Sequence, residues 1–154
     1  MNGELVTLLH RENCSCVVRS ADGRVRTFWQ RGVADLYDLY TTHPEWLDGA
    51  DMADKVVGRG AAALMVLGNI RTLHAEVIST PALALLRAAG IMVSIHYEVP
   101  FIINRQGNGR CPLETATEGI ADAQSMWPVI RHFVQQMRTL KQTVTVEYQN
   151  KYTL

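Results

Sequence analysis

The sequence predicts a three-layer αβα fold with a mixed, mostly parallel sheet, and three observations support this prediction. Two β-prone runs, residues 14–19 and 24–29, are joined by the turn Ala21-Asp22-Gly23 and indicate an N-terminal hairpin. From residue 50 onward, short strand-like segments alternate with helix-like ones. The 154 residues, 47% of them hydrophobic, are enough for one core. Such alternation implies right-handed crossovers and a sheet covered by helices on both faces.

The order of elements follows from periodicity and from helix-end signals. After the hairpin, GVADLYDLYTTH has apolar residues at helical spacing, and Cys111-Pro112-Leu113-Glu114 later opens another helical segment. Ser79 or Thr80 can cap the helix that begins near Pro81, because proline is favoured in a first helical turn. Between these segments we expect strands at 50–53, 71–78 and 92–98, and helices at about 57–67 and 81–89.

The C-terminal region is predicted to be a helix over about 123–140 followed by a tail. The helix has one apolar stripe, which packs either on its own sheet or on a second subunit, so a homo-oligomer is a candidate assembly. The stripe comprises Trp127, Ile130, Val134, Met137 and Leu140. The tail TVTVEY alternates apolar and polar residues, which favours either an added edge strand or a strand exchanged between subunits. We therefore expect one domain over 1–120, with 121–154 packed on it or on a partner.

Charge and cysteine content narrow the class of protein. Fifteen basic and fifteen acidic side chains leave no net charge, so neither nucleic acid nor a membrane surface is the expected partner. Residues 1–20 lack the pattern of a signal peptide, and the longest apolar run, AAALMVL, is far below the roughly 20 residues of a spanning helix. These features favour the cytoplasm. Cys14 and Cys16, two apart on a predicted strand, should share a face as core thiols, with a metal pair as the alternative.

Several motifs in the right order resemble the DUF1893 family of uncharacterised bacterial proteins. They are Ala53-Asp54-Lys55-Val56-Val57-Gly58, Ala75-Glu76-Val77-Ile78-Ser79, Ile102-Ile103-Asn104-Arg105 and Cys111-Pro112-Leu113-Glu114. The resemblance covers roughly residues 14–118. Together with the element order, it implies a cytidine deaminase-like fold, and it brings no established activity.

The zinc site of deaminases is not expected in this chain. The resemblance places the zinc elements at the starts of two helices, where this sequence reads Arg31-Gly32-Val33 and Asp54-Lys55-Val56-Val57-Gly58, without His or Cys. Leu73-His74-Ala75-Glu76 imitates the H-x-E element of zinc deaminases, but P-C-x-x-C is missing downstream. A mixed site of His74, Cys111 and Glu114 is the minor alternative. We expect no metal.

The turn 54–60 is the first half of a predicted anion site. Ligands of open α/β sheets gather beyond the carboxyl ends of the strands, where helix N-termini offer free N–H groups. Lys55 and Arg59 add two cations there, and Gly58 and Gly60 allow close approach. The alternative is that these glycines only let the helix pack tightly. Asp54, at the predicted strand end, is a cap, a ligand of a ribose hydroxyl, or a base.

The loop 104–114 is the predicted second half. Arg105 and Arg110 can form bidentate contacts with phosphate, and a glycine-rich path, including Gly109 after Asn104, permits tight turns. Cys111, at a helix start near arginines, is a structural thiol, a ligand-lining thiol or a nucleophile.

These features predict a zinc-free protein that binds a nucleotide or other phosphorylated small molecule, with an ADP-ribose-like compound as one example. No definite cofactor is indicated beyond a bound nucleotide. Two rivals remain open. One is a metal-free enzyme that uses Cys111 or Asp54 with Glu114 for group transfer or hydrolysis, and the other is an oligomerisation module.

Overall fold

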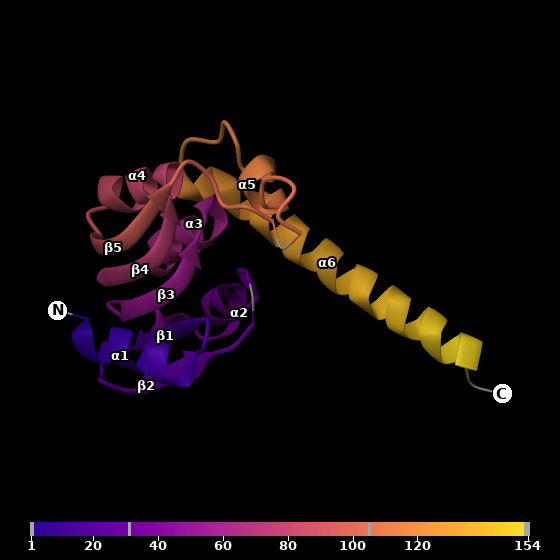
Figure 1. Ribbon diagram of the computed structural model, residues 1–154, viewed down its shortest axis with the longest axis horizontal. Coiled ribbons are helices and arrows are strands. Elements are labelled where there is room, and N and C mark those ends of the chain that lie inside the picture. The colour runs from indigo at the N-terminus through magenta and orange to yellow at the C-terminus, as the bar shows by residue number, and fades with distance from the viewer. Residues whose placement is uncertain (1, 31, 105, 153–154) are drawn as a thin grey trace.

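The computed structural model describes residues 2–30, 32–104 and 106–152, with the side chains of 143–152 outside the description. It contains a five-stranded sheet in the order β2-β1-β3-β4-β5 (Figure 1). β1 is antiparallel to both of its neighbours, while β3, β4 and β5 are parallel, so four strands run in one direction. The strands are β1 (Cys16–Arg19), β2 (Val25–Phe28), β3 (Asp51–Val57), β4 (Thr72–Ser79) and β5 (Met92–Val99).

Helices form the outer layers. α1 packs on β1 and β3, while α2, α3, α4 and α6 share the main core on the opposite side of the sheet. The predicted three-layer fold and the cytidine deaminase-like element order are thus present. The helices are α1 (Gly3–Glu12), α2 (Ala34–Thr42), a 3-10 turn η1 (Pro44–Trp46), α3 (Arg59–Gly68), α4 (Thr80–Ala88), α5 (Pro112–Ala116) and α6 (Ala123–Tyr152).

Local signals predicted most of these elements correctly. The hairpin pairs Cys16 with Phe28, and its turn uses Gly23 at φ +92°, a conformation that glycine adopts without strain. The Ser79 hydroxyl caps α4 by accepting a hydrogen bond from the N–H of Ala82. α3 is buried on nearly all sides because its small, apolar residues fit between the sheet and the neighbouring helices.

α1 was not predicted, and it changes the reading of the first two cysteines. Leu5 and Leu9 bury against Cys14, Val17 and Ala53 on the face of the sheet away from the main core. Cys16 belongs instead to the main core, so the expectation that the two thiols share a face was wrong. The reason is that β1 begins only at Cys16, and Cys14 lies in the irregular segment between α1 and β1.

β3 is longer than predicted. It continues to Val57 because residues 51–57 pair with β4, and α3 starts only at Arg59. Asp54 and Lys55 therefore lie within the strand and not in a turn at its end. Successive strand residues point to opposite faces, which separates these two side chains.

The predicted edge strand in the tail is also wrong, because α6 runs as one helix of 30 residues from Ala123 to Tyr152. Its first part packs on α2, α3 and α5, and its second part points away from the body (Figure 1). In that view no strand lies beside the projecting part. Residues 143–148 make their backbone hydrogen bonds within α6, because adding residues to an existing helix is easier than starting a new element.

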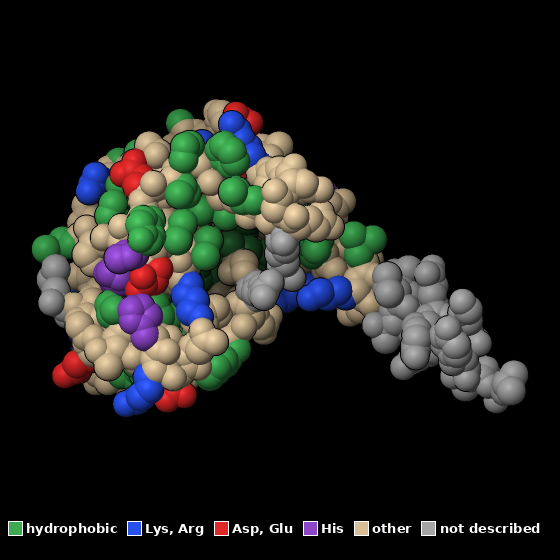
Figure 2. All heavy atoms as spheres, viewed as in Figure 1, with side chains coloured by type: hydrophobic (Ala, Val, Ile, Leu, Met, Phe, Trp, Pro, Cys, Tyr) green, Lys and Arg blue, Asp and Glu red, His purple; other side chains and the backbone are tan. Residues whose placement is uncertain are grey.

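The face of the sheet that carries α1 is only partly covered. Figure 2 shows hydrophobic side chains gathered over the β4 and β5 side, beyond α1. Tyr97 of β5 and Val56 of β3 are among the exposed hydrophobic residues. Among the described residues, no helix is both long enough and apolar enough to span a membrane.

Candidate functional site

The start of α3 is occupied by a carboxylate of the chain itself. The Oε1 atom of Glu114 accepts hydrogen bonds from the backbone N–H of Arg59, at 3.0 Å, and from the Ser79 hydroxyl, at 2.9 Å. Glu114 is buried, and α5 carries it into place from the Cys111-Pro112-Leu113-Glu114 motif. A helix N-terminus favours negative charge, and this internal anion takes the position where we expected a bound phosphate.

The two glycines at this turn make room for the side chains of α5. A Cβ atom on Gly58 would lie 2.7 Å from the Glu114 Oε1 atom, and one on Gly60 would lie 2.2 Å from the Leu113 Cδ2 atom. Neither glycine has a positive φ, so both are needed for space and not for backbone conformation. The two segments that we predicted to form the anion site, 54–60 and 104–114, do contact each other here. The contact is made by side chains of α5 that pack against the start of α3.

This region does not fit a zinc ion. Deaminase-type ligands would come from the starts of α2 and α3, but Val33 approaches Gly60 from α2, and Leu113 covers it from α5. Apolar groups thus stand where imidazole and thiolate ligands would be needed. Within the described residues, no group of three or more His, Cys, Asp or Glu side chains is arranged to hold a metal ion.

The alternative mixed zinc site is not formed. His74 lies in β4, where its Nδ1 atom is 2.8 Å from the Ser94 hydroxyl and its Nε2 atom is 3.4 Å from Glu76. Glu76 also pairs with His10 of α1, whereas Glu114 is held at Ser79, at the far end of β4.

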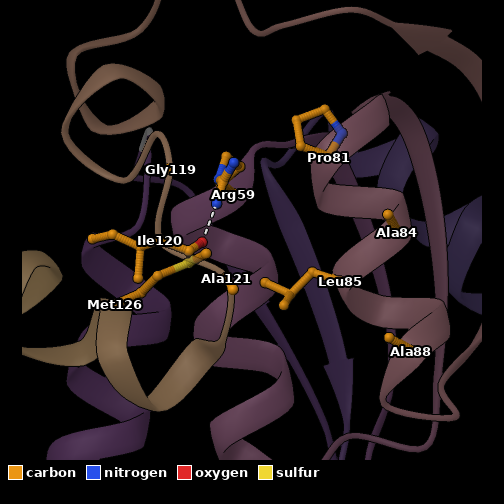
Figure 3. Close-up of a pocket in the computed structure, with 9 residues that line it drawn as sticks. All are labelled: Arg59, Pro81, Ala84, Leu85, Ala88, Gly119, Ile120, Ala121 and Met126. Atoms are coloured by element: carbon orange, nitrogen blue, oxygen red, sulfur yellow. Dashed lines mark hydrogen bonds between the residues drawn. The ribbon is translucent and has the colours of Figure 1, made fainter.

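Arg59 extends from the first turn of α3 toward the segment before α6. Its Nη2 atom donates a hydrogen bond to the backbone carbonyl of Ile120 (Figure 3), while its Nε atom is buried without a hydrogen-bond partner. Nε and Nη2 form one edge of the guanidinium group. In Arg71 the same edge is fully used, since its Nε and Nη2 atoms bind the two carboxylate oxygens of Asp51, at 3.0 and 2.6 Å. The same edge of Arg59 has one acceptor, at Nη2, and none at Nε.

Arg59 lies in the wall of an open groove, which we call the Arg59 groove. The groove has a volume of about 480 Å³, within the range of small-molecule sites. Figure 3 shows it between α4 and the segment 119–121, which leads into α6. Of the described residues that we predicted to bind a ligand, Arg59 is the one that lines this groove.

The other predicted cation of the turn points elsewhere. Lys55 donates a hydrogen bond from its Nζ atom to the side chain of Asn13, at the end of α1. α1 and α3 lie on opposite faces of the sheet, so Lys55 and Arg59 do not form the expected pair of cations.

The glycine-rich loop is held by its own residues. Asn104 accepts a backbone bond from Gly107 and donates one to Gly109, and its side-chain amide binds Asn108. Arg110 lies over the ring of Phe101 and pairs with Glu118 at 3.2 Å. Arg105 lies outside the described residues.

Asp54 forms a separate buried acidic site. Burial raises the pKa of Asp54 to about 7, although hydrogen bonds from the backbone N–H groups of Val56 and Lys55 oppose this shift, and the charge of Asp35 adds to it. Its neighbour on β1 is Cys16, whose thiol pKa is also raised well above its ordinary value by burial.

The three candidate catalytic residues are not brought together as one group. Cys111 is half-buried at the start of the five-residue helix α5, Asp54 lies in β3, and Glu114 caps α3. Among the described residues, no hydrogen bond links any two of these three side chains. A nucleophile with an adjacent base is therefore not apparent in this arrangement.

The wall of the groove opposite Arg59 was missed from the sequence. α4 presents Pro81, Ala84 and Ala88, spaced by three and four residues on one side of the helix. This spacing was visible in the sequence, but small residues on an exposed helix face give no signal of binding until another segment is placed across from them.

Comparisons with solved structures find proteins of similar fold. The crystal structure of a DUF1893 family protein (TM1506) from Thermotoga maritima is 25% identical, with a TM-score of 0.75, and the match covers 86% of this chain and 87% of that one. RibD from Acinetobacter baumannii is 16% identical over 53% of this chain and 28% of its own, with a TM-score of 0.39. An NE0047 mutant in complex with 8-azaguanine is 12% identical over 61% of this chain and 74% of its own, also with a TM-score of 0.39.

The match to the family model is longer than the region covered by the sequence motifs, which is roughly residues 14–118. The chain has no match among curated proteins. The family model described as TM1506, a domain of unknown function, matches residues 4–134, which adds α1 and the packed part of α6 to the region of resemblance. The chain belongs to the DUF1893 family.

Proposed function

We propose that the protein binds a small phosphorylated molecule, such as a nucleotide, with a phosphate group on Arg59. The observation that carries the proposal is the half-satisfied guanidinium edge, with Nη2 on the Ile120 carbonyl and Nε buried without a partner. A buried donor without an acceptor costs roughly 1–3 kcal/mol. A phosphate has the two oxygens that would satisfy both N–H groups, as the Asp51 carboxylate does for Arg71.

The position of Arg59 also supports the proposal. Glu114 and Ser79 fix the first turn of α3, from which the guanidinium extends into the groove. The backbone that carries Arg59 is therefore held in place, and the site has one charged group. A charged group on a fixed backbone binds an anion at low entropic cost. A nucleotide or an ADP-ribose-like compound belongs to this ligand class.

Thermal unfolding of the full chain with AMP, ADP-ribose, ribose 5-phosphate and phenyl phosphate tests the proposal. A ligand at one hundred times its Kd stabilises the folded state by about 2.7 kcal/mol, which for a chain of this size raises Tm by roughly 5–10 °C. We expect such a shift with at least one compound, its loss in Arg59→Gln, and a much smaller shift in Arg59→Lys, because lysine lacks the planar fork.

Arg87→Gln serves as the matched control, since Arg87 is an exposed arginine of α4 outside the groove lining. It removes the same charge and should leave the shift intact. The proposal is rejected if no compound raises Tm, or if Arg87→Gln and Arg59→Gln abolish the shift equally.

We propose as a second function that the projecting part of α6 pairs with a second copy of the chain. Met137 and Leu140 extend the apolar stripe beyond the packed residues Ile130 and Val134, and both are exposed. Arg138, between these two residues, pairs with Asp38 of α2 and ties this part of α6 to the body. An isolated helix of about 14 residues is marginal in water, and threonine and valine lower its helix propensity.

Light scattering of the full chain and of a chain truncated after Arg138 tests this pairing. Ending the chain after Arg138 keeps Met126, Ile130 and Val134 in the core, whereas ending it near residue 120 would remove part of the core itself. We expect the chain ending at 138 to be monomeric and folded, and the full chain to have the mass of a dimer, which is twice the mass of one full-length chain. A full chain of monomeric mass at high concentration excludes the pairing.

A further inference from the structure

We infer that the ligand of the Arg59 groove carries a single phosphate group on an apolar body, as in a phosphate monoester of an aliphatic or aromatic alcohol. This inference rests on the proposed function and narrows it. The charge comes from Arg59 alone among the described residues of the lining, and the other side chains that line the groove are apolar.

One wall of the groove is the outer face of α4. Pro81, Ala84, Leu85 and Ala88 follow one another along this face (Figure 3). The two alanines are exposed, and their short side chains leave the width that makes this surface a groove. Nothing on this wall can donate a hydrogen bond from a side chain.

The opposite wall is formed by the segment that leads into α6. Ile120, Ala121 and Met126 line it, and Figure 3 shows the Arg59 side chain close to the Ile120 backbone between the two walls. Met126 is buried in the main core, so this wall is anchored to the body of the protein.

The apolar walls select against a sugar. A ribose hydroxyl or a base edge that is buried against α4 and Ile120 would find no side-chain hydrogen-bond partner on these walls, which disfavours its burial there. A second phosphate would meet no second cation in the described lining. An alkyl or aryl group would instead bury apolar area against Leu85, Ala88 and Ile120.

A series of n-alkyl phosphates from methyl to hexyl, measured by calorimetric titration of the full chain, tests the inference. Burying one methylene is worth about 0.8 kcal/mol, so we expect affinity to rise about fourfold with each added carbon until the groove is filled. Hexyl phosphate should bind more tightly than AMP or ribose 5-phosphate.

Two outcomes separate this inference from the proposed function. If AMP or ADP-ribose binds through Arg59 and the alkyl series shows constant affinity, the inference is overturned while the proposed function stands. If no phosphorylated compound binds in a manner that depends on Arg59, the proposed function and the inference both fail.

A pair of variants on α4 locates the alkyl chain. Ala88→Glu places a like charge and a longer side chain in the groove, whereas Ala89→Glu makes the same change at the next residue, which is exposed and outside the lining. We expect Ala88→Glu to weaken hexyl phosphate binding at least tenfold and Ala89→Glu to leave it unchanged. Equal effects of the two variants would overturn the placement of the ligand along α4.

Discussion

The carboxylate of Glu114 should be the main electrostatic link between α5 and the start of α3. In Glu114→Gln the side chain keeps its shape, and its oxygen can still accept the bonds from the Arg59 N–H and the Ser79 hydroxyl. It loses the charge that interacts with the helix N-terminus and that strengthens both bonds. Partly buried charges at helix ends contribute up to about 2 kcal/mol, so we expect a loss of about 2 kcal/mol in the free energy of unfolding.

Truncation should cost more than neutralisation. Glu114→Ala also leaves the Arg59 N–H without its acceptor and opens a cavity beside Gly58, which brings the total loss to roughly 4 kcal/mol. For a chain of this size each kcal/mol lowers Tm by roughly 2–4 °C, so we expect losses of about 4–8 °C for Gln and about 8–16 °C for Ala.

Differential scanning calorimetry at neutral pH measures these losses, and Glu118→Gln is the matched control. Glu118 is an exposed glutamate just after α5 whose surface pair with Arg110 should be worth well under 1 kcal/mol. A Glu114→Gln variant that melts with the unchanged protein, or with Glu118→Gln, would refute the role of Glu114 as the anion of the α3 N-terminus.

Three further predictions concern packing, titration and thiol reactivity. Gly60→Ala should lose about 1–3 kcal/mol in urea unfolding, because its Cβ would meet Leu113, and Leu113→Ala should relieve part of this loss in the double variant. The folded-state pKa of Asp54 is raised to about 7, so the contribution of Asp54 to stability falls as pH rises between about 4 and 7. Asp54→Asn should therefore raise Tm more at pH 8 than at pH 5. An equal gain in Tm at both pH values contradicts this prediction. Mass mapping of iodoacetamide products should find Cys111 modified before the buried Cys16, whose thiol pKa is raised by burial, and the reverse order would count against the fold as described.

The candidate site could be predicted only in part from the sequence. The sequence marked Arg59 as a cation at a helix start and Glu114 as an acid in the first turn of another helix. Local signals alone predict Arg59 as a phosphate ligand and Glu114 as a candidate catalytic residue. Their contact joins positions 55 residues apart, and neither propensity nor periodicity contains information on that pairing.

The direction in which side chains point was the second feature of the site that could not be predicted from the sequence. Lys55 and Arg59 are four residues apart and would be neighbours on a helix, but the end of β3 lies between them. The strand sends Lys55 to Asn13 beside α1, while Arg59 follows α3 to Ile120 on the other face. A shift of a few residues in the predicted strand end was enough to misplace half of the expected site.

The sequence by itself determined the elements whose signals are local: the hairpin turn at Gly23, the Ser79 cap, and the alternation of strands and helices that makes a mostly parallel sheet. These depend on backbone conformation and on contacts within a few residues. Only the tertiary structure decided that Glu114 takes the place of an external anion, that Leu113 fills the space beside Gly60, and that α4 and Ile120 form a groove at Arg59. Those features depend on segments brought together by burial of the core, which is non-directional and leaves no local pattern along the chain.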